Sequence, residues 1–415
     1  MEKELHLIDE HFILVLNSGS SSLKFAIYHQ KTMHRQWSGV IREIGKPMGS
    51  MSVTDSHKHS LPLKKEHYRN VEDAANSIIL WLKENKKHCV ISAVGYRLVQ
   101  GGADHRSPEI ITRNLLKDLN SLIFLAPNHL PDELSLINIF LLEFPNLKHI
   151  ACFDTNFHRD MPDKNKYYPL PAKYADQGLM RYGFHGLSYE YILQKLNQQH
   201  AFIDQKKIII AHLGNGSSMS AISSGKGFDT TMGISPIGGL VMGTRCGDLD
   251  PGAILFMLKQ NDITPEELDV ELSHQSGLKA IAGTGDMQEI LNLSGDNQKA
   301  EAAITLYCCQ AKKFIAALAA SLGGLDMLIF TGGIGENSPE IRERICADMD
   351  FMGLKVDRCL NLRTEKVISC GSSRVCIRVM DTDEECMIAM HSKNMISATE
   401  ENEITFALEA GSEKV

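Results

Sequence analysis

Three stretches rich in glycine and serine contain the residues of this chain whose types and spacing could do chemistry. They are residues 17–22, 214–218 and 331–337, and each directly follows a short apolar run. A turn of small residues after a strand exposes backbone N–H groups and hydroxyls that can bind phosphate oxygens. One such stretch alone is more often a plain tight turn, but three in one chain favour phosphate binding.

Two common nucleotide-binding signatures are absent from the sequence. A Gly-x-x-x-x-Gly-Lys-Ser/Thr loop is excluded because Gly225-Lys226 is followed by Gly227. The run 283–288 has the first two glycines of a dinucleotide fingerprint but not the last one. The phosphate loops therefore belong to another kind of nucleotide-binding fold.

The first two stretches each lie within a predicted β-hairpin. Residues 12–16 and 23–28 flank the first stretch, and residues 207–213 and 219–222 flank the second. Leu16 aligns with Leu213 and Gly19 with Gly216, at an offset of 213 − 16 = 197 residues, close to half the chain. Two matching hairpins half a chain apart predict a duplicated fold.

Strands and helices alternate in the rest of the chain, which predicts α/β architecture in both halves. We expect an N-terminal domain over residues 1–155, with 388–415 packing back on it. A C-terminal, nucleotide-binding domain is expected over 156–387, with a cleft between the two domains. The individual predictions are helices over 71–84 and 301–322, strands over 93–99, 149–153 and 327–330, a loop over 331–337 and an irregular surface excursion over 46–65.

Composition and charge exclude several classes of protein. The net charge of −8 makes a poor non-specific nucleic-acid binder. The longest apolar stretch, 314–322, is too short to cross a membrane, and the N-terminus lacks the pattern of a signal peptide. Ten cysteines without a Cys-x-x-Cys pair indicate free thiols. We therefore expect a cytoplasmic protein that binds neither nucleic acid nor a membrane.

Nine sequence blocks resemble those of the acetate kinase family and appear in the family's order, from residue 13 to about residue 390. The resemblance implies two ribonuclease-H-like domains of the sugar-kinase and actin-like ATPase superfamily, with ATP in the interdomain cleft, and usually a homodimer. The blocks are NSGSSSLKF (17–25), GYRLV (95–99), APNH (126–129), FDTNFH (153–158), RYGFHGLS (181–188), HLGNGSS (212–218), MGTRCGDLDP (242–251), FTGGIGENSP (330–339) and TDEE (382–385).

The activity that the resemblance implies is reversible, Mg²⁺-dependent transfer of a phosphoryl group from ATP to acetate, giving acetyl phosphate and ADP by direct in-line transfer. ATP or ADP is then a substrate, and Mn²⁺ could replace Mg²⁺. A kinase that prefers propionate, butyrate or another short carboxylate stays open. A nucleotide-driven interaction protein on a related fold is a further alternative, but it would not need Arg97, His129, His185 and Arg245 together.

Transfer to a carboxylate brings two anions together, so catalysis must supply positive charge and alignment. By resemblance, Arg97 and Arg245 clamp the carboxylate and the transferring phosphoryl group. His185 is then a donor to the phosphoryl oxygens, and His129 helps on the substrate side. Asp154 orients a clamp arginine or the acceptor, with a nucleophilic aspartate as the alternative.

The resemblance also assigns the binding residues. Asn17 and Glu384 would bind the metal. The acyl pocket would consist of Arg97, Val99, Asn128, Phe184 and Pro236. The nucleotide and its phosphates would contact Ser20, Ser22, Lys24, His212, Leu213, Gly214, Asn215, Gly216, Asp286, Met287, Gln288, Gly332, Gly333, Ile334, Gly335 and Asn337.

Two of these residues depart from the family's usual pattern. Asn128 stands where the family commonly has a leucine that lines the acyl pocket. Gln288 stands where an arginine usually borders the adenosine. The preferences for the acyl chain and for the nucleotide therefore stay open.

Overall fold

The computed structural model describes residues 10–19, 21–85, 89–199, 201–260 and 263–412, with side chains as far as residue 398. The chain divides into two compact units, which are described separately. Unit 1 consists of Met1–Asn156 together with Asp383–Val415, and unit 2 consists of Phe157–Thr382.

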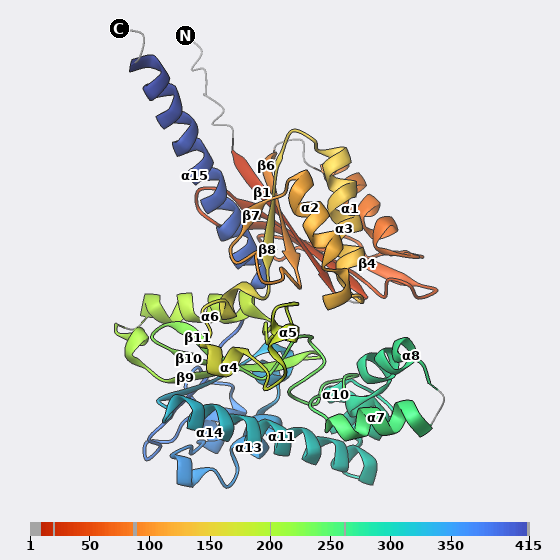
Figure 1. The fold of residues 1–415 in the computed structure, drawn as a ribbon, viewed down its shortest axis with the longest axis vertical. Coiled ribbons are helices and arrows are strands. Elements are labelled where there is room, and N and C mark those ends of the chain that lie inside the picture. Colours follow the sequence, from red (N-terminus) through yellow and green to blue (C-terminus); the bar gives the residue numbers. More distant parts are fainter. Residues whose placement is uncertain (1–9, 20, 86–88, 200, 261–262, 413–415) are drawn as a thin grey trace. The chain divides into compact units, whose positions relative to one another are not determined.

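Unit 1 is built on an eight-stranded sheet with the order β5-β4-β3-β2-β1-β6-β8-β7. Helices α1 and α3 cover one face of this sheet, and α15 crosses the other (Figure 1). Successive residues of β6 show the two faces, because Tyr96 packs on Phe140 of α3 whereas Gly95 lies against Ser392 of α15. The elements are β1 (His11–Gly19), β2 (Ser22–His29), β3 (Arg35–Arg42), β4 (Gly49–Asp55), β5 (Lys64–Glu66), α1 (Val71–Asn85), β6 (Val90–Leu98), β7 (Glu109–Ile110), α2 (Arg113–Ser121), α3 (Leu130–Glu143), β8 (Lys148–Phe153) and α15 (Glu384–Ser412).

Unit 2 is built on a five-stranded sheet with the order β11-β10-β9-β12-β13. Its strands are β9 (Ile208–Leu213), β10 (Ser217–Ser223), β11 (Lys226–Thr230), β12 (Met327–Thr331) and β13 (Cys376–Val379). Its α-helices are α4 (Asp163–Lys166), α5 (Ala172–Ala175), α6 (Gly186–Gln199), α7 (Pro251–Gln260), α8 (Pro265–Val270), α9 (Gly277–Ala282), α10 (Met287–Leu293), α11 (Gln298–Leu322), α12 (Gly332–Asn337), α13 (Pro339–Cys346) and α14 (Arg358–Leu362). Short 3-10 helices are η1 (Ile123–Leu125, in unit 1), η2 (Asn156–His158), η3 (Ile203–Gln205) and η5 (Asp350–Met352), and η4 (Glu271–Gln275) is a π-helix.

Both units repeat one strand order, which confirms the predicted duplication. Three antiparallel strands are followed by two parallel ones, as β3-β2-β1-β6-β8 in unit 1 and as β11-β10-β9-β12-β13 in unit 2. The constant offset of 197 residues is wrong at the hairpin tips, however. Gly19 pairs with Ser22 across two residues, whereas Leu213 pairs with Ser217 across three, so Gly19 ends a strand and Gly216 lies in a turn.

Two segments predicted to lack secondary structure contain strands or a helix. Residues 49–55 and 64–66, within the predicted surface excursion, are the strands β4 and β5. In β4 the buried Met51 and Val53 alternate with serines and a threonine on the open face, so the strand lacks a conspicuous apolar run. Residues 332–337, predicted as a loop, form α12, because the Glu336 carboxylate accepts the N–H of Gly332 at its first turn (2.9 Å).

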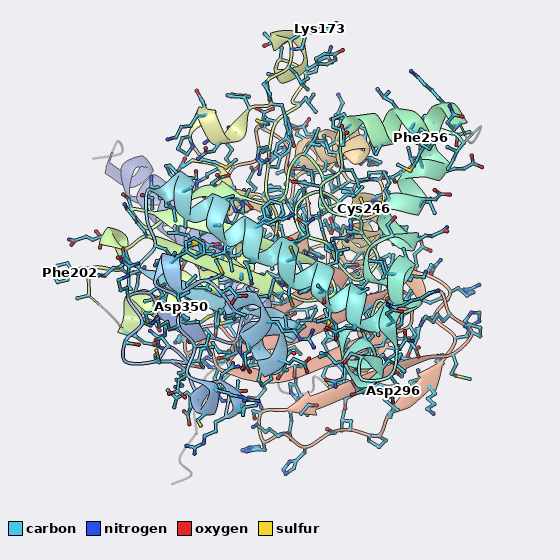
Figure 2. The ribbon with its side chains drawn as sticks, turned by 90° about the horizontal axis from the view of Figure 1, so that it is seen from below. Lys173, Phe202, Cys246, Phe256, Asp296 and Asp350 are labelled. Atoms are coloured by element: carbon cyan, nitrogen blue, oxygen red, sulfur yellow. The ribbon has the colours of Figure 1, made fainter. Side chains whose placement is uncertain are left out.

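Helix α11 is the long core helix of unit 2. Within the described residues it is the one helix with the length and apolar composition of a membrane span. Figure 2 shows it as the long turquoise helix lying across the strands of unit 2. Its inner face belongs to the core cluster of unit 2, through Ala300, Ile304, Tyr307, Ala311, Ile315 and Leu318. Packing in a core accounts for this apolar composition.

Arg342, on α13, fixes the end of α12 from inside the core. Its side chain is fully buried, and Nη1 donates to the carbonyl oxygens of Gly335 and Glu336, both at 2.8 Å. Nε donates to Oδ1 of Asn361 (2.8 Å). Burial lowers the pKa of Arg342 to about 10, which still leaves the guanidinium charged at neutral pH.

We predict that Arg342→Leu destabilises the protein by about 3–5 kcal/mol, because the buried carbonyls of α12 lose their donor. The measurement is urea unfolding followed by circular dichroism. Arg358→Leu is the control, since that side chain is 78% exposed and its loss should change the free energy of unfolding by about 0.5 kcal/mol or less. Equal effects of the two substitutions would contradict the structural role of Arg342.

Candidate active-site residues in the two units

Arg97 and Asp154 form a buried ion pair at the carboxyl ends of the parallel strands β6 and β8. Asp154 is fully buried, and its Oδ2 accepts hydrogen bonds from Arg97 Nε (3.0 Å) and Nη2 (2.5 Å). Arg97 Nη1 also donates to the carbonyl oxygen of Ser18 (3.1 Å). Burial acts to lower the pKa of Arg97, but the carboxylates of Asp154 and Glu384 outweigh it and raise that pKa above its ordinary value. Arg97 is therefore a permanent cation.

Two acidic side chains of α15 converge on the first phosphate loop. Asn17 Nδ2 donates to Glu384 Oε2 (3.0 Å) and to Glu385 Oε1 (2.8 Å). Lys24 Nζ lies 3.6 Å from the same oxygen of Glu385. Ser22 and Lys24 line a concavity of about 530 Å³ on this face of unit 1. Ser20, predicted as a phosphate contact, lies outside the described residues.

These residues fit a hard divalent cation that keeps most of its water. In the described part of the chain, no three His, Cys, Asp or Glu side chains are grouped to hold a metal. Mg²⁺ needs only one or two carboxylates besides water and substrate phosphates. The carboxylate oxygens of Glu384 and Glu385 beside Asn17 meet that requirement.

His185 is held in a strained backbone conformation before α6. Its φ of 59° is in the left-handed region, which residues other than glycine adopt uncommonly, asparagine, aspartate and histidine more often than the rest. Its Nδ1 hydrogen-bonds Ser218 Oγ (2.8 Å), and its ring stacks on His212 with centroids 4.4 Å apart. His212 Nδ1 in turn hydrogen-bonds Ser188 Oγ (2.8 Å). With its Nδ1 edge engaged, the His185 ring turns Nε2 to the opposite side.

The Nε2 edge of His185 and the guanidinium of Arg245 meet at Gly216. A Cβ built on Gly216 would lie 3.3 Å from His185 Nε2 and 3.4 Å from Arg245 Nη1. Arg245 Nη1 also donates to the carbonyl oxygen of Pro236 (3.3 Å). His185 and Arg245 are distant in sequence, yet they place an imidazole and a cation at the same loop. Gly216, which has no side chain, allows both groups to approach the loop closely. We call His185, His212, Gly216, Ser218 and Arg245 the unit 2 cluster.

A pocket of about 330 Å³ in unit 2 joins three segments of the predicted nucleotide site. Gly243, outside the lining, connects two of them: its N–H donates to the backbone oxygen of Asn215 (3.1 Å), and its carbonyl oxygen would lie 2.7 Å from a Cβ on Gly285. The lining residues are Gly214, Asn215, Gly285, Asp286, Met287, Gln288, Leu291, Gly333, Ile334, Asn337 and Ser338. The remaining predicted contacts are buried beside this pocket: Leu213 at the end of β9, and Gly332 and Gly335 in α12.

The predicted acyl-pocket residues differ in their exposure. Val99 and Phe184 are buried, Pro236 is half-buried and Asn128 is exposed. Val99 and Asn128 belong to unit 1, and Phe184 and Pro236 belong to unit 2. His129, the predicted helper, directly precedes α3 at its N-cap position.

Several polar residues in these clusters were not predicted. Glu385 lies within the block TDEE (382–385), but the resemblance assigns only its neighbour Glu384 as a metal ligand. Ser188 and Ser218 were also within blocks, and they orient the two histidines. Glu133, whose carboxylate accepts the N–H of Val99, gave no signal in the sequence. Its partner is 34 residues away along the chain.

The two sheets of matching strand order define a mixed α/β protein with a duplicated fold. The acetokinase family model matches residues 12–390. The acetate kinase of Methylocella silvestris is 36% identical over 392 residues, which cover 92% of this chain and 96% of that protein. The chain belongs to the acetokinase family. It is an enzyme of the acetate kinase type, and family membership supports phosphoryl transfer between ATP and a carboxylate.

Two solved structures are similar over nearly the whole chain. The crystal structure of Porphyromonas gingivalis acetate kinase has a TM-score of 0.83 at 34% identity and covers 93% of this chain and 100% of that one. A propionate kinase from Francisella tularensis has a TM-score of 0.87 at 33% identity, with coverage of 92% and 99%.

We predict that Gly333→Ala weakens ADP binding about tenfold without destabilising the fold, because a Cβ there meets no protein atom within 4 Å and faces the pocket. Isothermal titration calorimetry with ADP measures the binding, and a thermal melt measures the fold. Gly332→Ala is the contrast, because its φ is +76° and its Cβ would lie 2.7 Å from the Leu213 carbonyl oxygen, so that variant should lose stability. Unchanged ADP binding by Gly333→Ala would remove this glycine from the nucleotide site.

Proposed function

We propose that this chain catalyses the reversible, Mg²⁺-dependent transfer of the γ-phosphoryl group of ATP to acetate, giving acetyl phosphate and ADP. The observation that carries this proposal is the meeting of His185 and Arg245 at Gly216, one residue from the pocket that Asn215 lines. Positive charge and an imidazole beside a nucleotide-sized pocket suit the γ-phosphate of a bound nucleotide.

The transfer needs alignment and charge rather than a general base. A carboxylate oxygen of acetate forms the new bond to phosphorus while the bond to the leaving oxygen of ADP breaks, and no proton is lost from the acceptor. Arg245 and His185 bind the phosphoryl oxygens as charge develops on them. Arg97 attracts the acceptor carboxylate, and His129 assists on that side.

The role of Asp154 is to orient Arg97. Its Oδ2 is bound by two nitrogens of the guanidinium, which supports positioning over nucleophilic attack. A carboxylate held in this way keeps the guanidinium fork of Arg97 pointing in one direction. Asp154 is therefore assigned as a positioning residue.

Asn17 and Glu384 would hold Mg²⁺, with Glu385 close enough to contribute. A bound Mg²⁺ would neutralise charge on the nucleotide phosphates. Mn²⁺ takes the same oxygen ligands and could replace it. Lys24, Ser20 and Ser22 would complete the contacts to phosphate oxygens from the same loop.

Acetate is the proposed acceptor, and propionate or another short carboxylate is the alternative. Asn128 is exposed, so its amide gives no reason to prefer either acid. One methylene in an apolar pocket changes specificity by about 1–3 kcal/mol, so both acids can be turned over at different rates.

We propose further that two copies of the chain pair as a homodimer in the cytoplasm. Helix α7 supports the pairing, because none of its residues is buried and Leu255 and Phe256 are 53% and 62% exposed. Figure 2 shows Phe256 projecting outward from this helix. The ten cysteines are all free thiols, which suits a reducing compartment.

The proposed function is tested by trapping acyl phosphate with hydroxylamine in the presence of ATP, Mg²⁺ and acetate, propionate or butyrate. We predict the highest turnover with acetate, and a loss of about 10³-fold in Arg245→Ala, because a transition-state arginine contributes on that scale. The exposed Arg363 supplies the control variant Arg363→Ala, which should match the parent. Near-parent turnover in Arg245→Ala would remove it from the catalytic residues.

A separate prediction concerns the metal. Glu384→Gln should raise the Mg²⁺ concentration for half-maximal activity at least tenfold, because a carboxylate ligand becomes a neutral amide, while metal-free ADP binding stays unchanged. Glu143→Gln, on the far end of α3 and paired with Lys83, is the control. Superimposable Mg²⁺ titrations of Glu384→Gln and the parent would show that Glu384 is structural.

A further inference from the structure

A buried carboxyl group that the proposed mechanism does not use lies next to Arg97. Glu133, in the first turn of α3, is 2% exposed. Both of its oxygens face the backbone N–H of Val99, with Oε1 at 3.2 Å and Oε2 at 3.1 Å from the nitrogen. Strand β6 ends at Leu98, so Glu133 supplies the acceptor that the strand no longer provides for Val99.

The position of Glu133 matters because of what its strand carries. Arg97 is the second-last residue of β6, and Val99 directly follows the last one, Leu98. Arg97 is the proposed contact for the acceptor carboxylate, and Val99 the proposed wall of the acyl pocket. A group that fixes the Val99 backbone therefore fixes the segment that receives the acceptor.

The charges around Glu133 disfavour its ionised form. The charged groups that act on it are Arg97 from β6, Asp154 after β8 and Asp132 beside it on α3. Arg97 is already bound by Asp154. Glu384 also lies 4.0 Å from Arg97 Nε. An ionised Glu133 would therefore be a third carboxylate near this one guanidinium, and an acceptor carboxylate would be a fourth. Burial raises the pKa of Glu133 to about 8, even though Arg97 and the Val99 N–H act in the opposite direction.

We propose that Glu133 is a positioning residue that works in its protonated form: it holds Val99 at the end of β6, and its ionisation weakens binding of the acceptor carboxylate. The inference rests on the proposed function for the identity of the acceptor. As a neutral acid, Glu133 leaves the charge of Arg97 to the substrate. As an anion, it repels the substrate and competes for Arg97.

The first experiment measures the KM for acetate and kcat from about pH 6 to about pH 9.5, across the region in which Glu133 ionises. In the parent, the KM for acetate should rise several-fold above pH 8, with a smaller change in kcat and none in the KM for ATP. Glu133→Gln should keep the low KM throughout, because the amide accepts from Val99 and never ionises. Glu133→Ala should have a raised KM at every pH.

The second experiment needs no turnover. An unfolded glutamate titrates near pH 4.3, so between that pH and about 8 the folded parent holds one more proton than the unfolded chain. The stability contribution of Glu133 is therefore present at low pH and is lost as pH rises through this window. The melting temperature of the parent should fall more between pH 5 and pH 8 than that of Glu133→Gln. Glu143→Gln, paired with Lys83 at the other end of α3, should follow the parent in both experiments.

The outcomes separate this inference from the proposed function. If the parent forms no acyl phosphate from any acid, the function fails, while the difference in melting behaviour between the parent and Glu133→Gln should persist. If the parent is active and Glu133→Gln shows the same rise in KM, or the parent shows no rise, the role of Glu133 is overturned. Coincident melting profiles of the parent and Glu133→Gln would also overturn it.

Discussion

The chemistry proposed for unit 1 depends on keeping the guanidinium of Arg97 charged inside the protein. Arg97 is only 13% exposed and lies beside the fully buried Asp154. Taking two charges out of water costs several kcal/mol per ion, so a pair of this kind persists only with close geometry and further hydrogen bonds. The second contact, to the Ser18 carbonyl, comes from the first phosphate loop. The proposed clamp, Arg97, and the proposed phosphate loop are thereby held by one network.

The two units share a strand order but differ in the charge of the side chains around their first hairpins. In unit 1, Asn17 near the end of β1 contacts Glu384 and Glu385, and these two carboxylates favour a cation. In unit 2, the loop after β9 is bordered by His185 and Arg245, and its surroundings favour an anion. The backbone is similar in both units, so the difference comes from side chains that lie far from the hairpins in sequence.

Because these side chains are distant in sequence, only part of the structure could be predicted from the sequence. The hairpins, α1 and α11 follow from local periodicity, and the phosphate loops follow from runs of glycine and serine after strands. Strand β4 was missed because it lacks a conspicuous apolar run, and α12 was missed because side-chain contacts of Glu336 and Arg342 stabilise it. Glu385 and Glu133 contact residues 368 and 34 positions away, and no local pattern marks such contacts.

His185 shows how the fold of unit 2 maintains a strained residue. A left-handed backbone at a residue other than glycine costs about 1–3 kcal/mol, and it persists only where neighbours determine it from several sides. Here Gly183 closely approaches His158, where a Cβ would lie 2.5 Å from Nδ1, and the Ser218 hydroxyl contacts both His185 and Tyr189. A histidine that relaxed to ordinary backbone angles would turn its Nε2 edge away from Gly216. The strain is therefore best understood as the cost of aiming one imidazole nitrogen at the phosphate loop.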